Sequence, residues 1–349
     1  MNQPKTSLLC KENSSLSNPS VSDIYRTLNN IHGIAHEELN GEEKNIITSN
    51  FDSSLYLIEN FMRYIEISKS VPFIFNPSIS VSDQKLFVQL QQVNQWSCDF
   101  KAFFRYSPHV SLFFETIFTF PVAFSKRLDP QEIVLEKSMG AWANEFTNLL
   151  RERLHSRRFK DRLRHREENA KRSYSSSIRY IQHQFERHSR LLVLRMDFAM
   201  KNESFSEGEP LDRLLEYFSM LRSKMKRRSG VFKHMLGYIA HLEYALVKGH
   251  HLHAIFFFDG HRVRNGYNLS RLIANLWRRI TDNRGIYFNP HEKISQYQCP
   301  AIGMIHRSDE KKRCCLAYVI WYITKLDQQL MYKYSDRQRV FFRGEIGQK

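Results

Sequence analysis

Residues 249–258 read GHHLHAIFFF, and this stretch decides the fold of the second half of the chain. Its run of aromatic and branched residues is typical of a buried β-strand, because such side chains pack well on a pleated surface. Successive side chains of a strand point to opposite faces, so His251 and His253 would share one face while Leu252 points into the core. The stretch therefore predicts a strand that presents two imidazoles on one side of a sheet.

The segments around this strand predict a sheet covered by helices. In chain order we expect a strand at 191–198 with Arg195 and Asp197 on one face, a helix at 210–225, two strands that turn at Lys248–Gly249, a helix at 268–280 opened by Asn268, a strand at 301–306 and a helix started by Ser308. The order β-α-β-β-α-β-α is that of the ferredoxin-like, split-βαβ arrangement of an antiparallel sheet. We therefore predict an α+β protein in which the strands 191–198 and 249–258 are neighbours at the centre of the sheet.

The N-terminal part of the chain predicts helices. Residues 1–22 are rich in Ser, Asn, Pro and Lys and predict a disordered tail. From 23 to 150 the apolar residues have mostly helical spacing, and one helix is expected to open at Asp129 before Pro130. No motif in the region 23–150 indicates a function.

The charge of the chain predicts a polyanionic partner. A net charge of +16 favours nucleic acid over an anionic membrane surface, although a basic surface can also serve solubility alone. The segment 151–190 has thirteen Lys and Arg against five Asp and Glu. Such a run is often a solvated helix face with internal ion pairs, yet this excess is too one-sided to be neutralised within the segment. We expect DNA phosphate contacts from Arg157, Arg158, Lys160, Arg162 and Arg164, with Arg195 from the strand.

The sequence predicts a cytoplasmic protein without membrane contact. Its start, MNQPKTSLLCKENSS, has no apolar stretch of signal-peptide length. The longest apolar candidate, 110–124, is too short to cross a bilayer and contains Glu115 and Pro121. The five cysteines lack CxxC spacing, which favours reduced thiols over a disulfide framework or a zinc site.

His251 and His253 have the spacing at which two imidazoles reach one metal ion. With fifteen histidines in the chain, roughly 0.6 His-x-His triplets are expected by chance, and two surface histidines of an edge strand would give the same pattern. Glu243 on the preceding strand joins the imidazole face if the hairpin pairs odd with odd positions, and points away otherwise. Asp197 is a weaker candidate. A mixed His and carboxylate set suits Mg²⁺ or Mn²⁺ better than zinc.

The last expected helix carries Tyr318, Tyr322 and Lys325 on one face. An aromatic stripe with this spacing is often core packing, but a lysine that continues the stripe is unusual in a core. A phenol with a pKa near 10 is a poor nucleophile at neutral pH and needs a nearby cation. In the predicted fold this helix packs against the open face of the sheet, where the phenol would approach the metal.

A series of segments resembles one protein family. LLVLRMDF, GYIAHLEYALVKGHHLHAIFFFDG, YFNP, IGMI, YITKLDQ and RVFFRGE resemble, in this order, the HUH endonucleases named for histidine-hydrophobic-histidine. The resemblance is greatest to the inovirus-type rolling-circle replication initiators and their prophage-encoded bacterial relatives. It covers about 180–349 and implies a nuclease domain at 191–349, whereas 23–150 has no counterpart.

The resemblance implies a site-specific nickase of single-stranded or supercoiled origin DNA. His251 and His253 would hold the divalent metal with the help of Glu243. Tyr322 would attack the scissile phosphate and leave a 5′-phosphotyrosine link, and Lys325 would lie near the phosphate or orient the attacking oxygen. Some phage initiators alternate two tyrosines four residues apart, so Tyr318 either takes part or only packs.

Two other functions stay open at this stage. A non-catalytic, DNA-binding phage or prophage regulator would bind through the basic segment, weaken with salt and ignore chelators. A relaxase-like transfer protein would use the same chemistry on a mobile element. The resemblance allows a host helicase as a further partner and implies no small-molecule substrate.

Overall fold

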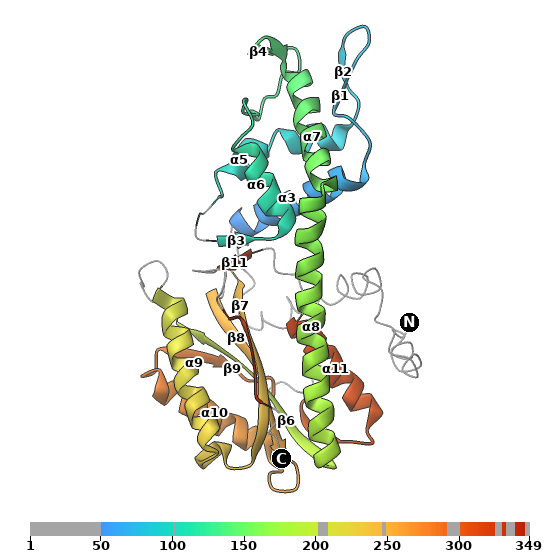
Figure 1. Cartoon of the computed structure of the whole chain (residues 1–349). Coiled ribbons are helices and arrows are strands. Elements are labelled where there is room, and N and C mark those ends of the chain that lie inside the picture. Colours follow the sequence, from blue (N-terminus) through green and yellow to red (C-terminus); the bar gives the residue numbers. More distant parts are fainter. Residues whose placement is uncertain are drawn as a thin grey trace, which may run out of the picture.

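The chain folds into a helical region and a sheet-containing body (Figure 1). The computed structural model describes residues 50–100, 102, 104–201, 209–245, 249–291, 301–324, 330–332 and 339–345. The predicted tail, the hairpin turn at Lys248 and the side chain of Lys325 lie outside the described residues. The predicted mixture of helices with an antiparallel sheet is confirmed.

The helical region surrounds an aromatic core. Its elements are α3 (Asn50–Ile67), β1 (Phe73–Phe75), β2 (Ile79–Val81), α4 (Gln84–Leu90), α5 (Val93–Ser97), β3 (Phe104–Tyr106), α6 (Pro108–Ile117), β4 (Ile133–Val134), β5 (Lys137–Ser138) and α7 (Met139–His155). Phe61, Phe113 and Phe146 in α3, α6 and α7 have no exposed surface. Because large buried aromatic side chains dominate core energetics, these helices form one packed unit.

The helix expected to open at Asp129 begins instead at Met139. The Asp129 carboxylate accepts a hydrogen bond of 2.9 Å from the backbone two residues later and so stabilises a turn. Leu135 and Glu136 then adopt φ angles of 49° and 65°, which close the β4–β5 hairpin. Ser138 is the residue that caps α7.

A buried ionic cluster lies inside the helical region. Nδ1 of His109 is 3.3 Å from Glu59 Oε1, and its Nε2 is 3.0 Å from Glu66 Oε2. Arg63 and the Ser107 hydroxyl also contact Glu59. Burial raises the pKa of Glu59, but its bonds to His109 outweigh burial and hold the pKa at about 2. Burial lowers the pKa of His109, and the two carboxylates outweigh it and raise the pKa above the ordinary value.

We expect this cluster to stabilise the fold most between pH 4.5 and pH 6.5, the ordinary pKa values of Glu59 and His109. Because the folded pKa of Glu59 is depressed, its contribution is lost as the pH falls from 4.5 toward 2, by about 3 kcal/mol in all. Because the folded pKa of His109 is raised, its contribution is lost as the pH rises above 6.5. Urea denaturation across this pH range measures both losses. A His109→Gln variant whose alkaline loss is as large as that of the original chain would contradict this origin.

The body contains a six-stranded antiparallel sheet with the order β10-β6-β8-β7-β12, in which β9 also pairs with β6. Its strands are β6 (Arg190–Met200), β7 (Met235–Ala245), β8 (Gly249–Asp259), β9 (Gly285–Phe288), β10 (Gly303–His306) and β12 (Phe341–Arg343). β6 pairs with β8 from Leu191 opposite Asp259 to Ala199 opposite His251. The predicted neighbourhood of these two strands is therefore confirmed.

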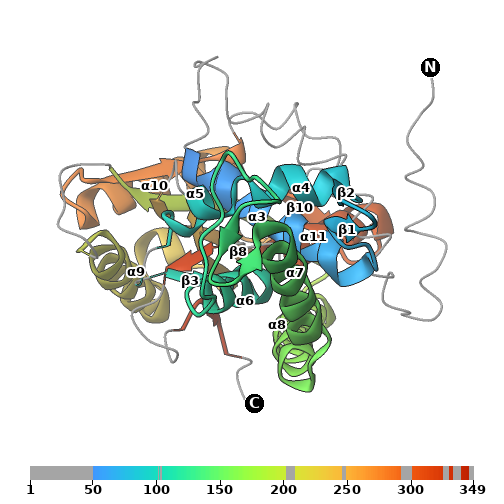
Figure 2. The ribbon, with the colours of Figure 1, turned by 90° about the horizontal axis from the view of Figure 1, so that it is seen from above.

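Different helices cover the two faces of the sheet (Figure 2). The helices are α8 (Arg157–Arg187), α9 (Glu209–Arg227), α10 (Gly266–Ile280) and α11 (Glu310–Thr324), with a short 3₁₀ turn at Gly230–Phe232. Even-numbered residues of β6 and β8, such as Leu192 and Phe256, pack beneath α9 and α10. Odd-numbered residues, such as Val193 and Phe257, pack beneath α8 and α11. The odd face is also the face of the two histidines, because side chains alternate along a strand.

α10 and α11 have different caps from those expected. α10 is capped by Asn265, whose side chain accepts a hydrogen bond from the backbone N–H of Asn268. α11 follows Asp309, whose Oδ1 accepts from the backbone of Lys312 at 3.1 Å, while the Ser308 hydroxyl lies 2.7 Å from the ring of His306. In both helices the cap is the polar residue whose oxygen reaches the N–H three residues later.

One helix of 31 residues, α8, connects the helical region to the body. Phe159 near its start is buried in the helical core, and Tyr180 near its end is buried against the sheet. The residues 164–173 between them include no buried side chain. A second connection is β11 (Leu330–Tyr332), which pairs antiparallel with β3.

Tyr180 fixes α8 on the sheet. Its ring is fully buried, and a Cβ atom placed on Gly237 or Gly344 would overlap its hydroxyl oxygen. We expect Gly237→Ala to lower the free energy of unfolding by about 1–3 kcal/mol, because the added methyl group overpacks the core. Urea denaturation measures the loss. The double variant Tyr180→Phe/Gly237→Ala should recover part of it, and a Gly237→Ala variant as stable as the original chain would contradict this packing.

Two expectations concern the environment of the chain. Cys98 is a free thiol, but Cys315 is disulfide-bonded, so the prediction of reduced thiols is wrong at Cys315. Among the described residues, no helix combines the length and apolar character that crossing a bilayer requires.

Candidate metal centre

Three predicted metal ligands lie together on the odd face of the sheet. One ligand atom from each of Glu243, His251 and His253 lies within 4.8 Å of the other two. Nε2 of His253 is 3.1 Å and Nε2 of His251 is 3.7 Å from Oε2 of Glu243. The β7–β8 register causes this proximity, because it pairs Glu243 with His251 and thus odd with odd positions. The condition under which Glu243 joins the imidazole face is therefore met.

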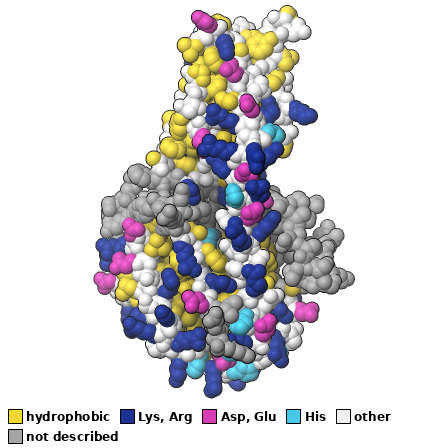
Figure 3. Space-filling view, viewed as in Figure 1, with side chains coloured by type: hydrophobic (Ala, Val, Ile, Leu, Met, Phe, Trp, Pro, Cys, Tyr) yellow, Lys and Arg dark blue, Asp and Glu magenta, His cyan; other side chains and the backbone are white. Residues whose placement is uncertain are grey.

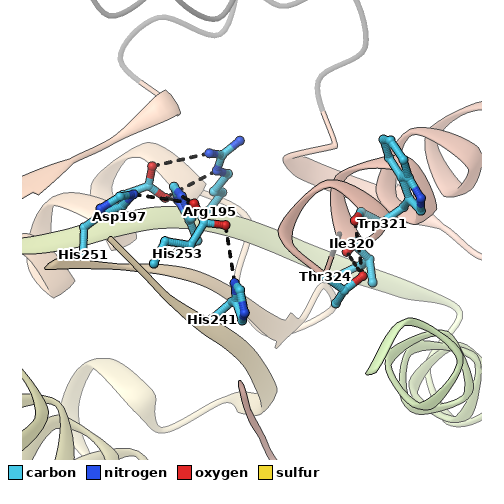
Figure 4. Close-up of polar contacts among 9 residues, drawn as sticks. Arg195, Asp197, His241, His251, His253, Ile320, Trp321 and Thr324 are labelled. Atoms are coloured by element: carbon cyan, nitrogen blue, oxygen red, sulfur yellow. Dashed lines mark hydrogen bonds and ion pairs between the residues drawn. The ribbon is translucent and has the colours of Figure 1, made fainter. Parts of the chain in front are cut away.

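β6 adds a carboxylate and a guanidinium on the other side of β8. Asp197 pairs with His253 across the strands, and its Oδ1 lies 2.7 Å from Nδ1 of His253. Arg195 holds both oxygens of Asp197 at 3.4 Å through Nε and Nη2 (Figure 4). A carboxylate at Nδ1 fixes the orientation of a histidine ring and leaves Nε2 for a metal. In His253 this Nε2 is directed at Glu243.

The cluster is almost sealed from solvent, since His251 and His253 are 7% and 6% exposed. Burial lowers the pKa of His253, but the charges of Asp197 and Glu243 outweigh burial and raise the pKa to about 9. Burial raises the pKa of Glu243, but the charge of His253 outweighs it, and this pKa lies well below its usual value. The pKa of Asp197 is lowered in the same way by Arg195 and His253. The centre thus combines two buried anions with an imidazolium ion.

A divalent cation fits this arrangement in charge and in donor atoms. Two buried carboxylates need positive charge nearby, and the cation can replace the proton of His253 in that role. Two imidazole nitrogens and one carboxylate oxygen suit Mn²⁺ and, less well, Mg²⁺, with further positions left for substrate oxygens or water.

Tyr322 lies on the helix that covers the same face as the cluster. β10 ends with His306 beside Arg190 of β6, so α11 starts there and runs back along β6. The path from Glu310 to Tyr322 along α11 is about 18 Å, and that from Arg190 to Asp197 along β6 is about 23 Å. The last turn of α11 therefore lies toward the end of β6 that carries Asp197.

The hydroxyl of Tyr322 is within the electrostatic reach of the cluster. Burial raises its pKa, the charges of Glu243 and Asp197 raise it further and Arg195 lowers it, with a result of about 12. These groups come from β6, β7 and α11, so the fold brings them together from distant parts of the sequence. Burial and the two carboxylates make the phenol a weak acid, and a cation held by Glu243, His251 and His253 would counter the influence of the carboxylates.

Tyr318 lies one helical turn before Tyr322. Its hydroxyl is buried without a hydrogen-bond partner among the described residues, and its ring lies tilted by 33° against that of Trp321, with centroids 5.7 Å apart. Burial raises its pKa. Both interpretations of Tyr318, a second nucleophile or a packing residue, agree with this position.

Several predicted DNA contacts on α8 are engaged in ion pairs. These pairs are Arg162 with Glu115 at 2.7 Å, Arg164 with Asp161 at 2.9 Å and Arg157 with Asp161 at 3.9 Å. Arg158 and Lys160 are exposed and have no ion pair with a described residue. The sequence analysis allowed for ion pairs within this segment, and the phosphate contacts expected from its five named residues stay a prediction. Figure 3 shows the side chains of α8 among the dark blue groups of this face.

His241 is a member of the cluster that the sequence analysis missed. Its Nδ1 lies 3.4 Å from Oε1 of Glu243, and it pairs with His253 across the β7–β8 ladder. The alternation of side chains could have found it, because His241 and Glu243 are two positions apart in one strand.

Comparison with known sequences places this site within a family. The sequence model of the YagK/YfjJ C-terminal domain matches residues 154–342, more than half of the chain, and this range includes β6, β7, β8 and α11. No curated protein and no solved structure matches the chain. The match agrees with the prophage-encoded relatives in the resemblance described above, and the endonuclease part of that resemblance stays a prediction. The chain belongs to the YagK/YfjJ C-terminal domain family, which is associated with prophages.

Proposed function

We propose that this protein is a metal-dependent enzyme that nicks and rejoins single-stranded DNA, as HUH endonucleases do when they initiate rolling-circle replication. The observation that supports this function best is the position of Tyr322, on the face of the sheet that presents Glu243, His251 and His253 and within reach of their charges. The strand order of the sheet is compatible with the ferredoxin-like fold of such enzymes.

His251, His253 and Glu243 would hold the cation, Mg²⁺ or Mn²⁺. Asp197 would keep His253 in the tautomer whose Nε2 lacks a proton, because its negative charge lies 2.7 Å from Nδ1 and favours a proton there. When bound, the cation supplies polarisation of a phosphate oxygen and neutralises negative charge. Arg195, beside Asp197, would contact the same phosphate, and Lys325 is proposed to lie near it.

Tyr322 would supply the nucleophile. Its oxygen forms a bond to the phosphorus of a phosphodiester, and the bond from phosphorus to the 3′ oxygen breaks. The phenolic proton is lost and the 3′ oxygen takes up a proton, so the products are a 5′-phosphotyrosine ester and a free 3′-hydroxyl. The reverse attack of a 3′-hydroxyl on this ester rejoins the strand. Arg158 and Lys160 would contact the phosphates of the adjoining DNA.

Formation of a covalent adduct tests this function. The full chain is incubated with Mn²⁺ and a pool of single-stranded oligonucleotides of random sequence, labelled at either end. A 3′ label should remain with the protein under denaturing conditions, a 5′ label should not, and a chelator should prevent both adduct and cleavage. A pool that yields no adduct with either Mn²⁺ or Mg²⁺ would contradict the proposal.

The second candidate is a non-catalytic DNA-binding protein of a prophage. The observation that favours it is the net charge of +16 together with exposed basic residues outside the metal centre. This function predicts binding that weakens steeply with salt, is unchanged by a chelator and produces no adduct.

A further inference from the structure

Helix α10 has an outward side with positive charge and no acidic group. Its apolar side, which includes Leu269, Ile273 and Trp277, packs on the even face of the sheet. The helix sequence GYNLSRLIANLWRRI contains neither Asp nor Glu. Its exposed residues are Tyr267, Asn268, Arg271, Leu272, Asn275, Arg278 and Arg279.

The positions of these residues form ordered rows. Asn268 and Asn275 are seven residues apart and therefore lie on one line, about 10 Å apart, near the middle of the outward side. Arg271 and Arg278, also seven apart, form a row on one flank of this line. Arg279 lies on the other flank. Guanidinium groups thus border a central line of two amides.

The charges of this side are not neutralised by the described part of the protein. Arg271, Arg278 and Arg279 have no ion pair with a described residue, and Arg271 contacts only the ring of Tyr267, at 5.8 Å. On α8, by contrast, acidic residues of the same helix and of α6 engage the arginines. Figure 3 shows dark blue side chains, with some magenta ones among them, across the visible face of the body. A polyanion is the partner that such a surface favours.

We infer that α10 docks into the major groove of duplex DNA. The major groove admits an α-helix, and arginine and asparagine are the side chains that pair in bidentate fashion with guanine and adenine edges. The flanking arginines can reach phosphates, which fix the position of a helix in the groove. Leu272 and Tyr267, 51% and 46% exposed, provide apolar contacts for thymine methyl groups.

Duplex DNA fits α10 better than other polyanions do. Single strands are held by several aromatic rings on which unstacked bases lie, and Tyr267 is the one ring on the outward side of α10. An anionic membrane binds amphipathic helices through their apolar side, and that side of α10 is buried against the sheet.

Duplex recognition goes beyond the proposed nicking function and uses other residues. α10 covers the even face, whereas the metal centre and Tyr322 belong to the odd face. The sheet therefore separates a duplex-binding side from a strand-cutting side. Failure of one proposal leaves the other intact.

Affinity for a labelled 30-base-pair duplex tests the inference, with the full chain in chelator to exclude cleavage. The double variant Arg271→Ala/Arg278→Ala should bind at least about tenfold more weakly, with a salt slope smaller by about 2. The matched control, Lys126→Ala/Arg127→Ala, removes the same charge from an exposed loop of the helical region and should bind within about twofold of the original chain. Equal losses in both variants would overturn the inference.

A charge-neutral variant tests base reading. Asn268→Ala/Asn275→Ala should bind with the same salt slope as the original chain. When duplexes are selected from a random pool, its preference for particular base sequences should be about tenfold weaker. The duplex assignment would be overturned if a single strand competed for binding as well as the duplex does. It would also be overturned if phosphatidylserine vesicles bound the original chain but not Arg271→Ala/Arg278→Ala. Both variants should melt like the original chain and keep metal-dependent adduct formation on single strands. Loss of the adduct would show that α10 supports the metal centre and would also overturn the inference.

Discussion

Replacement of Tyr322 by phenylalanine is expected to lower the yield of covalent protein–DNA adduct by at least about a thousandfold. The substitution removes the attacking oxygen and keeps the ring, which packs against the core beneath α11. Stability should therefore change little, and the melting temperature measures this separately. Adduct formation with a 3′-labelled oligonucleotide pool and Mn²⁺ measures the loss.

Tyr318→Phe is the matched control on the same helix. It removes a buried hydroxyl that has no hydrogen-bond partner among the described residues, so the variant should fold at least as well as the original chain. If Tyr318 only packs, this variant keeps the full adduct yield. If the two tyrosines alternate, a first adduct still forms through Tyr322 but strand transfer to a second site fails. An adduct that persists in Tyr322→Phe and disappears in Tyr318→Phe would assign the nucleophile to Tyr318.

The sequence was sufficient to predict His251 and His253 as members of the candidate metal centre, but it missed His241 and did not determine the geometry. Alternation along 249–258 placed His251 and His253 on one face, and the pattern left the position of Glu243 open. A shift of one residue in the β7–β8 register would have turned Glu243 to the other face, and the sequence around Lys248 does not determine that register. The β6–β8 register likewise decides that Asp197 contacts His253.

Charge was harder to interpret from sequence because ion pairs join distant segments. The sequence shows an excess of Lys and Arg within 151–190. It does not show that Glu115, which lies in α6, forms an ion pair with Arg162. For α10 the sequence predicted only a helix, and its basic outward side was not recognised. Its outward side becomes identifiable only when the sheet shows which side of the helix is covered.

Replacement of one histidine is expected to cause a large loss of metal affinity. His251→Ala should weaken Mn²⁺ binding at least about a hundredfold, because two protein ligands then remain of three. This variant leaves His253 between Asp197 and Glu243, so the buried carboxylates keep their imidazolium partner and the fold is retained. Isothermal titration calorimetry measures the affinity without requiring catalysis.

His250→Gln is the matched control, because His250 precedes His251 in β8 and points to the opposite face of the sheet. It should bind Mn²⁺ as the original chain does. At a hundredfold excess of Mn²⁺ over its dissociation constant, bound metal adds about 2.7 kcal/mol of stability. The original chain and His250→Gln should therefore melt at a higher temperature with Mn²⁺, and His251→Ala should not. Equal loss of binding in both variants would mean that β8 was disturbed, and undiminished binding in His251→Ala would remove this residue from the metal centre.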